Sequence, residues 1–291
     1  MRRLAAALAA ALALTACRGG DAREDDTSLV AAGDIASCFW SGDEATARLL
    51  DRIGGVVATL GDNAYPNGSD NDYRRCYHRS WGRHLERTRP AVGNHEYKTK
   101  DAAGYFRYFG ARAGPPGKGW YSYDHDGWHL VVLNSDEPLE RGTEQYRWLV
   151  NDLRAHPSRC TLAYMHHPRW SSGRHGGKER VVDAYRAMYD AGVDVVLGGH
   201  DHHYERFAPQ DPVGRLDRVR GIRQFVVGTG GAPSYRLRER SPNSEAIAAH
   251  VRGVLRMVFH EDGYEWEFVP VRARTFTDRG RATCSDVRPG A

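Results

Sequence analysis

The sequence predicts an α/β fold with mixed β-sheets, and three observations support this prediction. Over the first two thirds of the 291 residues, short apolar segments of strand length alternate with segments of helical periodicity. The last third is richer in strand patterns and ends in a hairpin pattern. The sequence contains no internal repeat or interior linker, and 41% apolar with 27% charged residues is an ordinary globular composition. We therefore expect one domain over residues 28–274 and a C-terminal tail over residues 275–291.

The first half of this domain is expected to alternate strands with helices. The predicted strands are residues 28–34, which end in a polar turn, residues 56–60 and both arms of a hairpin over residues 121–134; residues 90–96 are predicted to pass from a strand into a loop. The predicted helices are residues 45–53 and 72–89. The pair Gly54-Gly55 ends the first helix, and the turn pair Asp126-Gly127 marks the hairpin.

The second half begins with a helix that Thr143 can cap, because Tyr146, Leu149, Val150 and Leu153 then share one face. A further helix is expected over about residues 178–191. The remaining predicted strands are residues 160–165, 193–197, 222–227 and the hairpin arms 254–260 and 264–271, which turn at Asp262-Gly263.

The N-terminus has the layout of an export signal. A positive start at Arg2-Arg3 precedes an apolar stretch from Leu4 to Ala16 that is too short to span a bilayer, so residues 1–16 are predicted to be a signal peptide. Leu14-Thr15-Ala16-Cys17 resembles the lipobox of bacterial lipoproteins, which implies acylation of Cys17, with residues 17–27 as a flexible tether. The alternative is a plain secretory signal with an incidental Cys17. Either way, the protein is expected to be exported, as a lipoprotein on the outer side of the cytoplasmic membrane or as a secreted protein.

The charge pattern gives no argument for nucleic acid as a partner. The formal net charge is +4, and removal of Arg2 and Arg3 with the signal leaves about +2. The remaining arginines are scattered instead of forming a polybasic block. We expect no specific nucleic-acid binding, and membrane contact only through a lipid anchor at Cys17.

Four cysteines remain after Cys17, an even number that permits two disulfides in an oxidising compartment. Three pairings are possible. We favour Cys38 with Cys76, because both lie in loops that follow neighbouring strands, and Cys160 with Cys284, which would fasten the tail.

Five apolar strands are each followed by polar residues that can bind metal ions. These clusters are Gly33-Asp34, Gly61-Asp62 with Tyr65, Gly93-Asn94-His95-Glu96, His166-His167-Pro168 and Gly199-His200-Asp201-His202. Loops at the carboxyl ends of strands in α/β sheets converge on one crevice, so these distant side chains can meet. Oxygen and nitrogen ligands suit iron, manganese or zinc, and seven candidates fit two ions that share one carboxylate.

In this order, the clusters resemble the motifs of the calcineurin-like metallophosphoesterases, specifically the purple acid phosphatase branch. The resemblance extends from about Leu29 to Gly231, and Tyr65 with the string from His202 to Arg206 points to the purple branch. It implies a four-layer α/β/β/α sandwich of two mixed β-sheets flanked by helices. Ala36 departs from the wider superfamily, in which many members carry histidine there, so that position has no ligand or base role.

The resemblance also implies two metal ions and their ligands. Ferric iron would be held by Asp34, Asp62, Tyr65 and His202. A divalent iron, zinc or manganese ion would be held by Asp62, Asn94, His166 and His200, with Asp62 as the bridge. His95 would be a proton or hydrogen-bond donor to the leaving group. His175 occupies the place of a substrate-contacting histidine, and Arg174 is a weaker phosphate-binding candidate.

The implied function is hydrolysis of phosphomonoesters by in-line attack of a metal-bound hydroxide, as in an acid phosphatase, on a phosphorylated small molecule or nucleotide. The alternatives are phosphodiesterase or nucleotidase activity at the same site, or a noncatalytic surface lipoprotein that binds metal or phosphate. Tyr65 could instead be a packed aromatic residue, and His175 an exposed loop residue. His167 and His203 are expected behind the ligands or at the pocket rim. Glu96 either orients His95 or is only a charged neighbour, and Gly228–Gly231 is expected to be a tight return beside the site.

Overall fold

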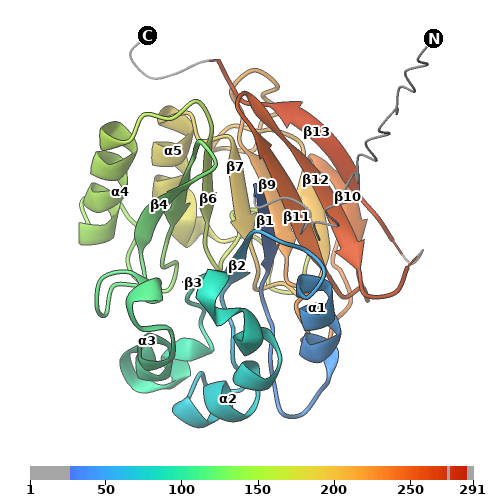
Figure 1. Cartoon of the computed structure of the whole chain (residues 1–291). Coiled ribbons are helices and arrows are strands. Elements are labelled where there is room, and N and C mark those ends of the chain that lie inside the picture. Colours follow the sequence, from blue (N-terminus) through green and yellow to red (C-terminus); the bar gives the residue numbers. More distant parts are fainter. Residues whose placement is uncertain (1–26, 274–275, 287–291) are drawn as a thin grey trace, which may run out of the picture.

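The fold consists of two mixed β-sheets packed face to face, with helices on their outer sides (Figure 1). The computed structural model describes residues 27–273 and 276–286. The α/β/β/α sandwich predicted from the sequence is thereby confirmed. The predicted signal peptide, Cys17 and nearly all of the tether lie outside the described residues.

The first sheet has six strands in the order β13-β12-β11-β1-β2-β3. Their bounds are β1 Ser28–Ala32, β2 Val56–Leu60, β3 Thr88–Ala91, β11 Gly253–His260, β12 Gly263–Pro270 and β13 Arg279–Thr283. Strands β1, β2 and β3 are parallel to one another. Strand β11 pairs antiparallel with β1, β12 with β11, and β13 with β12. The loops after β1, β2 and β3 therefore leave the sheet at the same edge.

The second sheet has seven strands in the order β10-β8-β9-β7-β6-β5-β4. Their bounds are β4 Tyr121–His125, β5 Trp128–Val132, β6 Thr161–Tyr164, β7 Val195–Gly198, β8 Tyr204–Phe207, β9 Arg223–Val227 and β10 Ser244–Ala248. Strands β5, β6, β7 and β9 are parallel, so their carboxyl ends also share one edge.

The α-helices are α1 Gly42–Leu50, α2 Asp70–Arg75, α3 Ala103–Phe109, α4 Glu144–Ala155 and α5 Val182–Asp190. Short 3₁₀ helices cover Tyr77–Arg79, Trp81–Arg87, Glu96–Lys98, Lys100–Ala102, Gly110–Ala113 and Glu179–Val181. As predicted, α4 begins after Thr143, whose hydroxyl accepts a hydrogen bond from the Tyr146 amide. None of the helices among the described residues combines the length and the apolar character that a membrane span requires.

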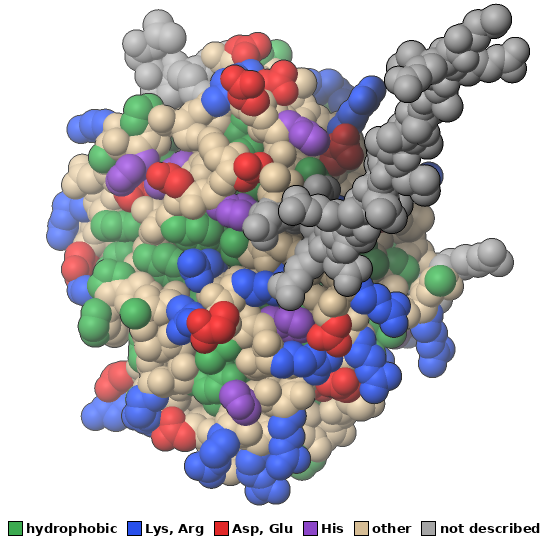
Figure 2. Space-filling model, in the orientation of Figure 1, with side chains coloured by type: hydrophobic (Ala, Val, Ile, Leu, Met, Phe, Trp, Pro, Cys, Tyr) green, Lys and Arg blue, Asp and Glu red, His purple; other side chains and the backbone are tan. Residues whose placement is uncertain are grey.

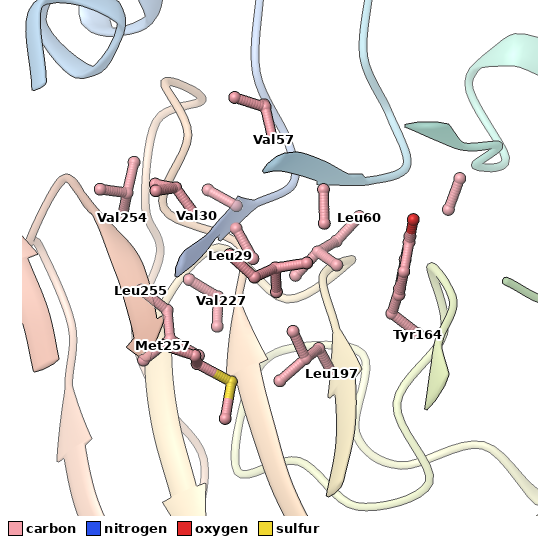
Figure 3. Packing of buried hydrophobic residues seen from close by; sticks show 14 of the residues in the cluster. Leu29, Val30, Val57, Leu60, Tyr164, Leu197, Val227, Val254, Leu255 and Met257 are labelled. Atoms are coloured by element: carbon pink, nitrogen blue, oxygen red, sulfur yellow. The ribbon is translucent and has the colours of Figure 1, made fainter. Parts of the chain in front are cut away.

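Side chains along each strand alternate between the two faces of its sheet, and those on the inner faces form the core between the sheets. In the second sheet, Leu162, Tyr164 and Leu197 face the first sheet, whereas Ala163 and Val196 face α4 and α5. Figure 3 shows the inter-sheet layer, in which Leu29, Leu255 and Met257 of the first sheet approach Val227 and Leu197 of the second. This apolar layer fixes the two sheets relative to each other and so positions the loops at their edges.

Three sequence expectations differ from the structure. The predicted helix over residues 72–89 is α2 followed by two short 3₁₀ helices, and it gives way to β3 because Pro90 disfavours a helical Arg89. The helix over residues 45–53 begins earlier and ends at Leu50. The predicted tail contains β13, whose alternating polar residues carry no apolar period.

The predicted disulfides are both present, joining Cys38 to Cys76 and Cys160 to Cys284. The first connects the loop after β1 to the end of α2. The second ties the segment after β13 to the start of β6. On the surface, acidic and basic side chains are interspersed over the face drawn in Figure 2.

Candidate metal centre

Loops that follow β1, β2, β3, β6 and β7 converge at one edge of the sandwich. Backbone hydrogen bonds connect them in sequence: the Asp34 amide donates to the Gly61 carbonyl at 3.0 Å, and the Gly199 amide donates to the His166 carbonyl at 2.9 Å. The seven predicted ligand residues are all on these loops. Their donor atoms form two adjacent groups.

The first group contains oxygen and nitrogen atoms of Asp34, Asp62, Tyr65 and His202. The Tyr65 hydroxyl lies 3.0 Å from Asp34 Oδ1 and 3.0 Å from Asp62 Oδ2. His202 Nε2 lies 3.2 Å from the same hydroxyl and 3.3 Å from Asp34 Oδ1. Four donor atoms therefore face one point.

The second group surrounds His166 Nε2. This atom lies 3.1 Å from Asn94 Oδ1, 3.2 Å from His200 Nδ1 and 3.4 Å from Asp62 Oδ1. Asp62 thus presents Oδ2 to the first group and Oδ1 to the second. A carboxylate placed in this way can bridge two cations.

Two of the imidazoles are oriented by hydrogen bonds on the side away from the site. His166 Nδ1 donates to the Leu60 carbonyl at 2.9 Å, and His202 Nδ1 donates to the Pro233 carbonyl at 2.8 Å. In the neutral imidazole, each contact leaves the lone pair on Nε2, the atom that faces the donor group. The orientation of both rings therefore suits metal binding.

The backbone at three of these residues adopts the left-handed conformation that is uncommon for residues other than glycine. The φ angles are 59° at Asp34, 49° at Asp62 and 69° at His200. Such strain is concentrated at functional sites in proteins. Gly61 adds a packing requirement, because a Cβ atom there would lie 2.6 Å from His166 Nδ1. The loops are thus shaped to bring the donor atoms together.

The charge balance of the site fits bound cations. Asp34 and Asp62 are 0% and 2% exposed, and among residues 27–273 and 276–286 no lysine or arginine pairs with either carboxylate. Burial and these two negative charges raise the pKa of Tyr65 well above its ordinary value. Buried carboxylates are costly unless a positive charge compensates them, and metal ions are one such compensation.

Glu96 supports the loop after β2 instead of orienting His95. Its buried carboxylate accepts hydrogen bonds from the backbone amides of Asp62, Asn63, Ala64 and Gly93 at 2.8–3.2 Å. The Tyr73 hydroxyl is a fifth donor, at 3.2 Å. Burial and the charge of Asp62 raise the pKa of Glu96, and the amide donors oppose that shift. From the sequence, Glu96 was expected either to orient His95 or to be only a charged neighbour. Neither expectation describes its support of these backbone amides.

Replacing Glu96 with alanine should therefore destabilise the protein. Four buried amides and a hydroxyl would lose their acceptor, at a cost of about 1–3 kcal/mol for each group left unsatisfied. We expect the free energy of unfolding in urea to fall by at least about 3 kcal/mol. Glu140→Ala, at an exposed position, is the control and should change it by less than about 0.5 kcal/mol. Equal stability of the two variants would contradict this role for Glu96.

His95 and His175 each border the donor groups, His95 beside Tyr65 and His175 beside His200. The His95 amide donates to Asp62 Oδ1 at 2.8 Å, and its ring centroid lies 4.2 Å from that of Tyr65. The His175 ring lies 4.6 Å from His200, and its amide donates to the buried Asp201 carboxylate at 2.8 Å. Both rings are outside the donor groups but adjacent to them.

Other side chains next to the donor groups contact the loops that carry the candidate ligands. The buried His167 lies 2.9 Å from Ser135 Oγ and 4.3 Å, ring to ring, from His200, whereas His203 pairs with Glu205 at 3.0 Å. Tyr235, which sequence reasoning did not identify, donates to the His200 carbonyl at 3.0 Å and lies 4.6 Å from the His202 ring. No motif surrounds Tyr235, so only its position in the fold reveals it.

Two other groups of potential ligands are explained without a metal ion. His129 contacts Asp152 at 2.9 Å and Asp124 at 2.8 Å, so carboxylates occupy both of its ring nitrogens. The other group, Cys160, Asp194 and Cys284, contains the second disulfide. The edge of the sandwich therefore remains the best candidate centre among the described residues.

Comparison with known proteins finds relatives in sequence and in fold. The model of the calcineurin-like phosphoesterase family matches residues 27–204. Purple acid phosphatase 21 of Arabidopsis thaliana is 32% identical over 267 residues, which cover 79% of this chain and 57% of that protein. The phosphoenolpyruvate phosphatase of Allium cepa is 32% identical over 178 residues, which cover 53% of this chain and 36% of that protein. This chain thus spans a little more than half of the length of the first relative.

Solved structures share the fold. A purple acid phosphatase from yellow lupin (Lupinus luteus) seeds has a TM-score of 0.71 at 18% identity. The match covers 89% of this chain and 54% of the lupin chain. GAP50, the anchor in the inner membrane complex of Plasmodium, has a TM-score of 0.68 at 13% identity. The match covers 89% of this chain and 90% of the GAP50 chain.

Proposed function

Because this chain belongs to the calcineurin-like phosphoesterase family and resembles its purple acid phosphatase branch, we propose that it is a metal-dependent hydrolase of phosphomonoesters. The observation that carries the proposal is the placement of Asp62, whose two oxygens face two separate donor groups. This arrangement suits a pair of cations, the number that a phosphoryl-transfer clamp requires.

The donor atoms suggest how the cations are divided. Asp34, Asp62, Tyr65 and His202 would hold ferric iron, because a phenolate is a hard anionic ligand. Asp62, Asn94, His166 and His200 would hold divalent iron, zinc or manganese. When bound, the ions supply Lewis acidity that offsets phosphoryl charge and lowers the pKa of water.

The neighbouring side chains would handle the substrate. His95 lies beside Asp62 without joining either donor group, so it can give a proton or hydrogen bond to the leaving oxygen. His175, next to His200, can contact the phosphate beside the second donor group. Arg174, whose guanidinium carbon lies 5.9 Å from the Tyr235 ring centroid, is a second candidate for the same contact.

Tyr65→Phe tests the iron assignment. The phenylalanine keeps the ring packing but removes the oxygen that faces Asp34 and Asp62. If the wild-type protein is isolated with ferric iron, it should show a visible phenolate-to-iron absorption band, and the variant should lose it. A visible band of equal intensity in the variant would refute Tyr65 as an iron ligand.

A panel of phosphoesters tests the activity itself. We expect purified protein to hydrolyse the monoester phenyl phosphate faster than the diester diphenyl phosphate. Faster cleavage of the diester would favour the phosphodiesterase alternative instead. Tight metal binding with no turnover of any nucleotide, monoester or diester would favour a noncatalytic protein.

The disulfides support a location outside the cytoplasm, since such bonds persist in oxidising compartments. We propose that the protein is exported and that Cys17 carries a lipid anchor. Mass spectrometry of the mature N-terminus would decide between an acylated Cys17 and a plain secretory cleavage.

A further inference from the structure

A row of side chains beside the first donor group ends in Lys98, to which the two-metal mechanism gives no role. Along this row, Trp40 packs edge to face on Tyr65 at 5.3 Å, and Tyr65 packs on His95 at 4.2 Å. Lys98 Nζ then lies 2.9 Å from His95 Nδ1 and 3.1 Å from His95 Nε2. An ammonium group therefore lies within hydrogen-bond distance of both nitrogens of the ring that we assign to the leaving group.

Lys98 does not serve as a structural ion-pair partner. Among residues 27–273 and 276–286, no carboxylate lies within 4 Å of its ammonium, and the side chain is exposed. Lys118 is the contrasting case, because its ammonium contacts Glu144 at 2.6 Å. His95 Nδ1 can donate to the Pro66 carbonyl at 2.6 Å, so the ring has a second partner that can fix it without Lys98.

We propose that Lys98 is a specificity-determining residue that binds a second anionic group on the leaving-group side of the substrate. This inference rests on the proposed phosphomonoesterase function and on the placement of His95 beside the leaving oxygen. The four-carbon side chain allows the ammonium to turn from the ring toward a ligand beside it. The favoured substrates are thus phosphomonoesters whose leaving alcohol carries its own carboxylate or phosphate.

The reaction itself is ordinary hydrolysis. The water gives up one proton as its oxygen bonds to phosphorus, the bond from phosphorus to the leaving oxygen breaks, and that oxygen takes up one proton. The products are the free alcohol and inorganic phosphate. Lys98 exchanges no proton or electron in this scheme. Its charge stabilises the anionic part of the substrate, which remains on the departing alcohol.

Two substrates that differ at one group test the inference. Glycerol 2-phosphate and 2-phosphoglycerate share the same phosphorylated carbon, and the second carries a carboxylate where the first has a hydroxymethyl group. The measurement is the selectivity, defined as kcat/KM for 2-phosphoglycerate divided by kcat/KM for glycerol 2-phosphate. We expect Lys98→Met to lower this selectivity about tenfold, the effect of losing one charged hydrogen bond. Lys98→Arg should keep it within about threefold of wild type.

Lys100→Met is the matched control, because it removes the same charge from an exposed position two residues away. It should leave the selectivity unchanged, whereas an equal effect of both variants would point to general electrostatic attraction and overturn the inference. Equal losses on both substrates in Lys98→Met would also overturn it, since Lys98 would then act only through His95. Wild-type protein that hydrolyses neither ester would instead refute the proposed function.

Discussion

Asp62→Asn should empty or disorder both cation positions and lower turnover by about 10³-fold or more. An asparagine offers one neutral oxygen where Asp62 presents two charged oxygens, Oδ2 beside Tyr65 and Oδ1 beside His166. Loss of the ions removes several kcal/mol of transition-state stabilisation, and each 1.36 kcal/mol corresponds to tenfold in rate. Elemental analysis and phosphoester turnover on the same sample are the measurements.

Because Asp62 has a left-handed backbone, the control variant should replace another aspartate in that conformation. Asp126 also has a left-handed backbone, with φ of 50° against 49° at Asp62, but it is exposed in the turn between β4 and β5. Asp126→Asn should keep the wild-type metal content and activity. If Asp62→Asn also keeps its full metal content, the bridging role is excluded.

His95→Ala should keep the metal ions but lose about 10²–10⁴-fold in turnover, the usual contribution of a general acid. The variant retains the backbone amide that donates to Asp62, so the donor groups keep this support. Because a proton donor matters most for a poor leaving group, the loss should be larger for an alkyl phosphate than for p-nitrophenyl phosphate.

The control for His95 is His260→Ala, at an exposed position at the end of β11. It should retain wild-type turnover on both substrates. An equal loss on the alkyl and the nitrophenyl ester in His95→Ala would contradict proton donation. Loss of metal from that variant would show that His95 holds the site together instead.

The fold was largely predictable because its strands carry strong apolar patterns and its turns carry clear glycine signals. The hairpin at Asp126-Gly127 and the helix after Thr143 are examples. Elements without apolar periodicity were not predictable. β13 alternates arginine with small residues, and β8 directly follows the histidine cluster, whose candidate ligand residues carry no strand pattern.

The convergence of the ligand candidates was predictable because each follows a strand end, and parallel strands deliver their loops to a common edge. The structure places their donor atoms within hydrogen-bond or ion-pair distance of one another, although their roles as ligands stay predictions. Supporting residues were harder to foresee. Three of the four backbone amides that donate to Glu96 lie outside its own motif, in the loop after β2. Tyr235 reaches the site from a loop without a motif.

The most direct test of the account is to locate the metal ions by anomalous scattering in crystals of the purified protein. We expect two ions about 3.5–4 Å apart, both in contact with Asp62, one beside Tyr65 and the other beside His166. A single ion, or ions bound away from Asp62, would contradict the proposed dinuclear hydrolase.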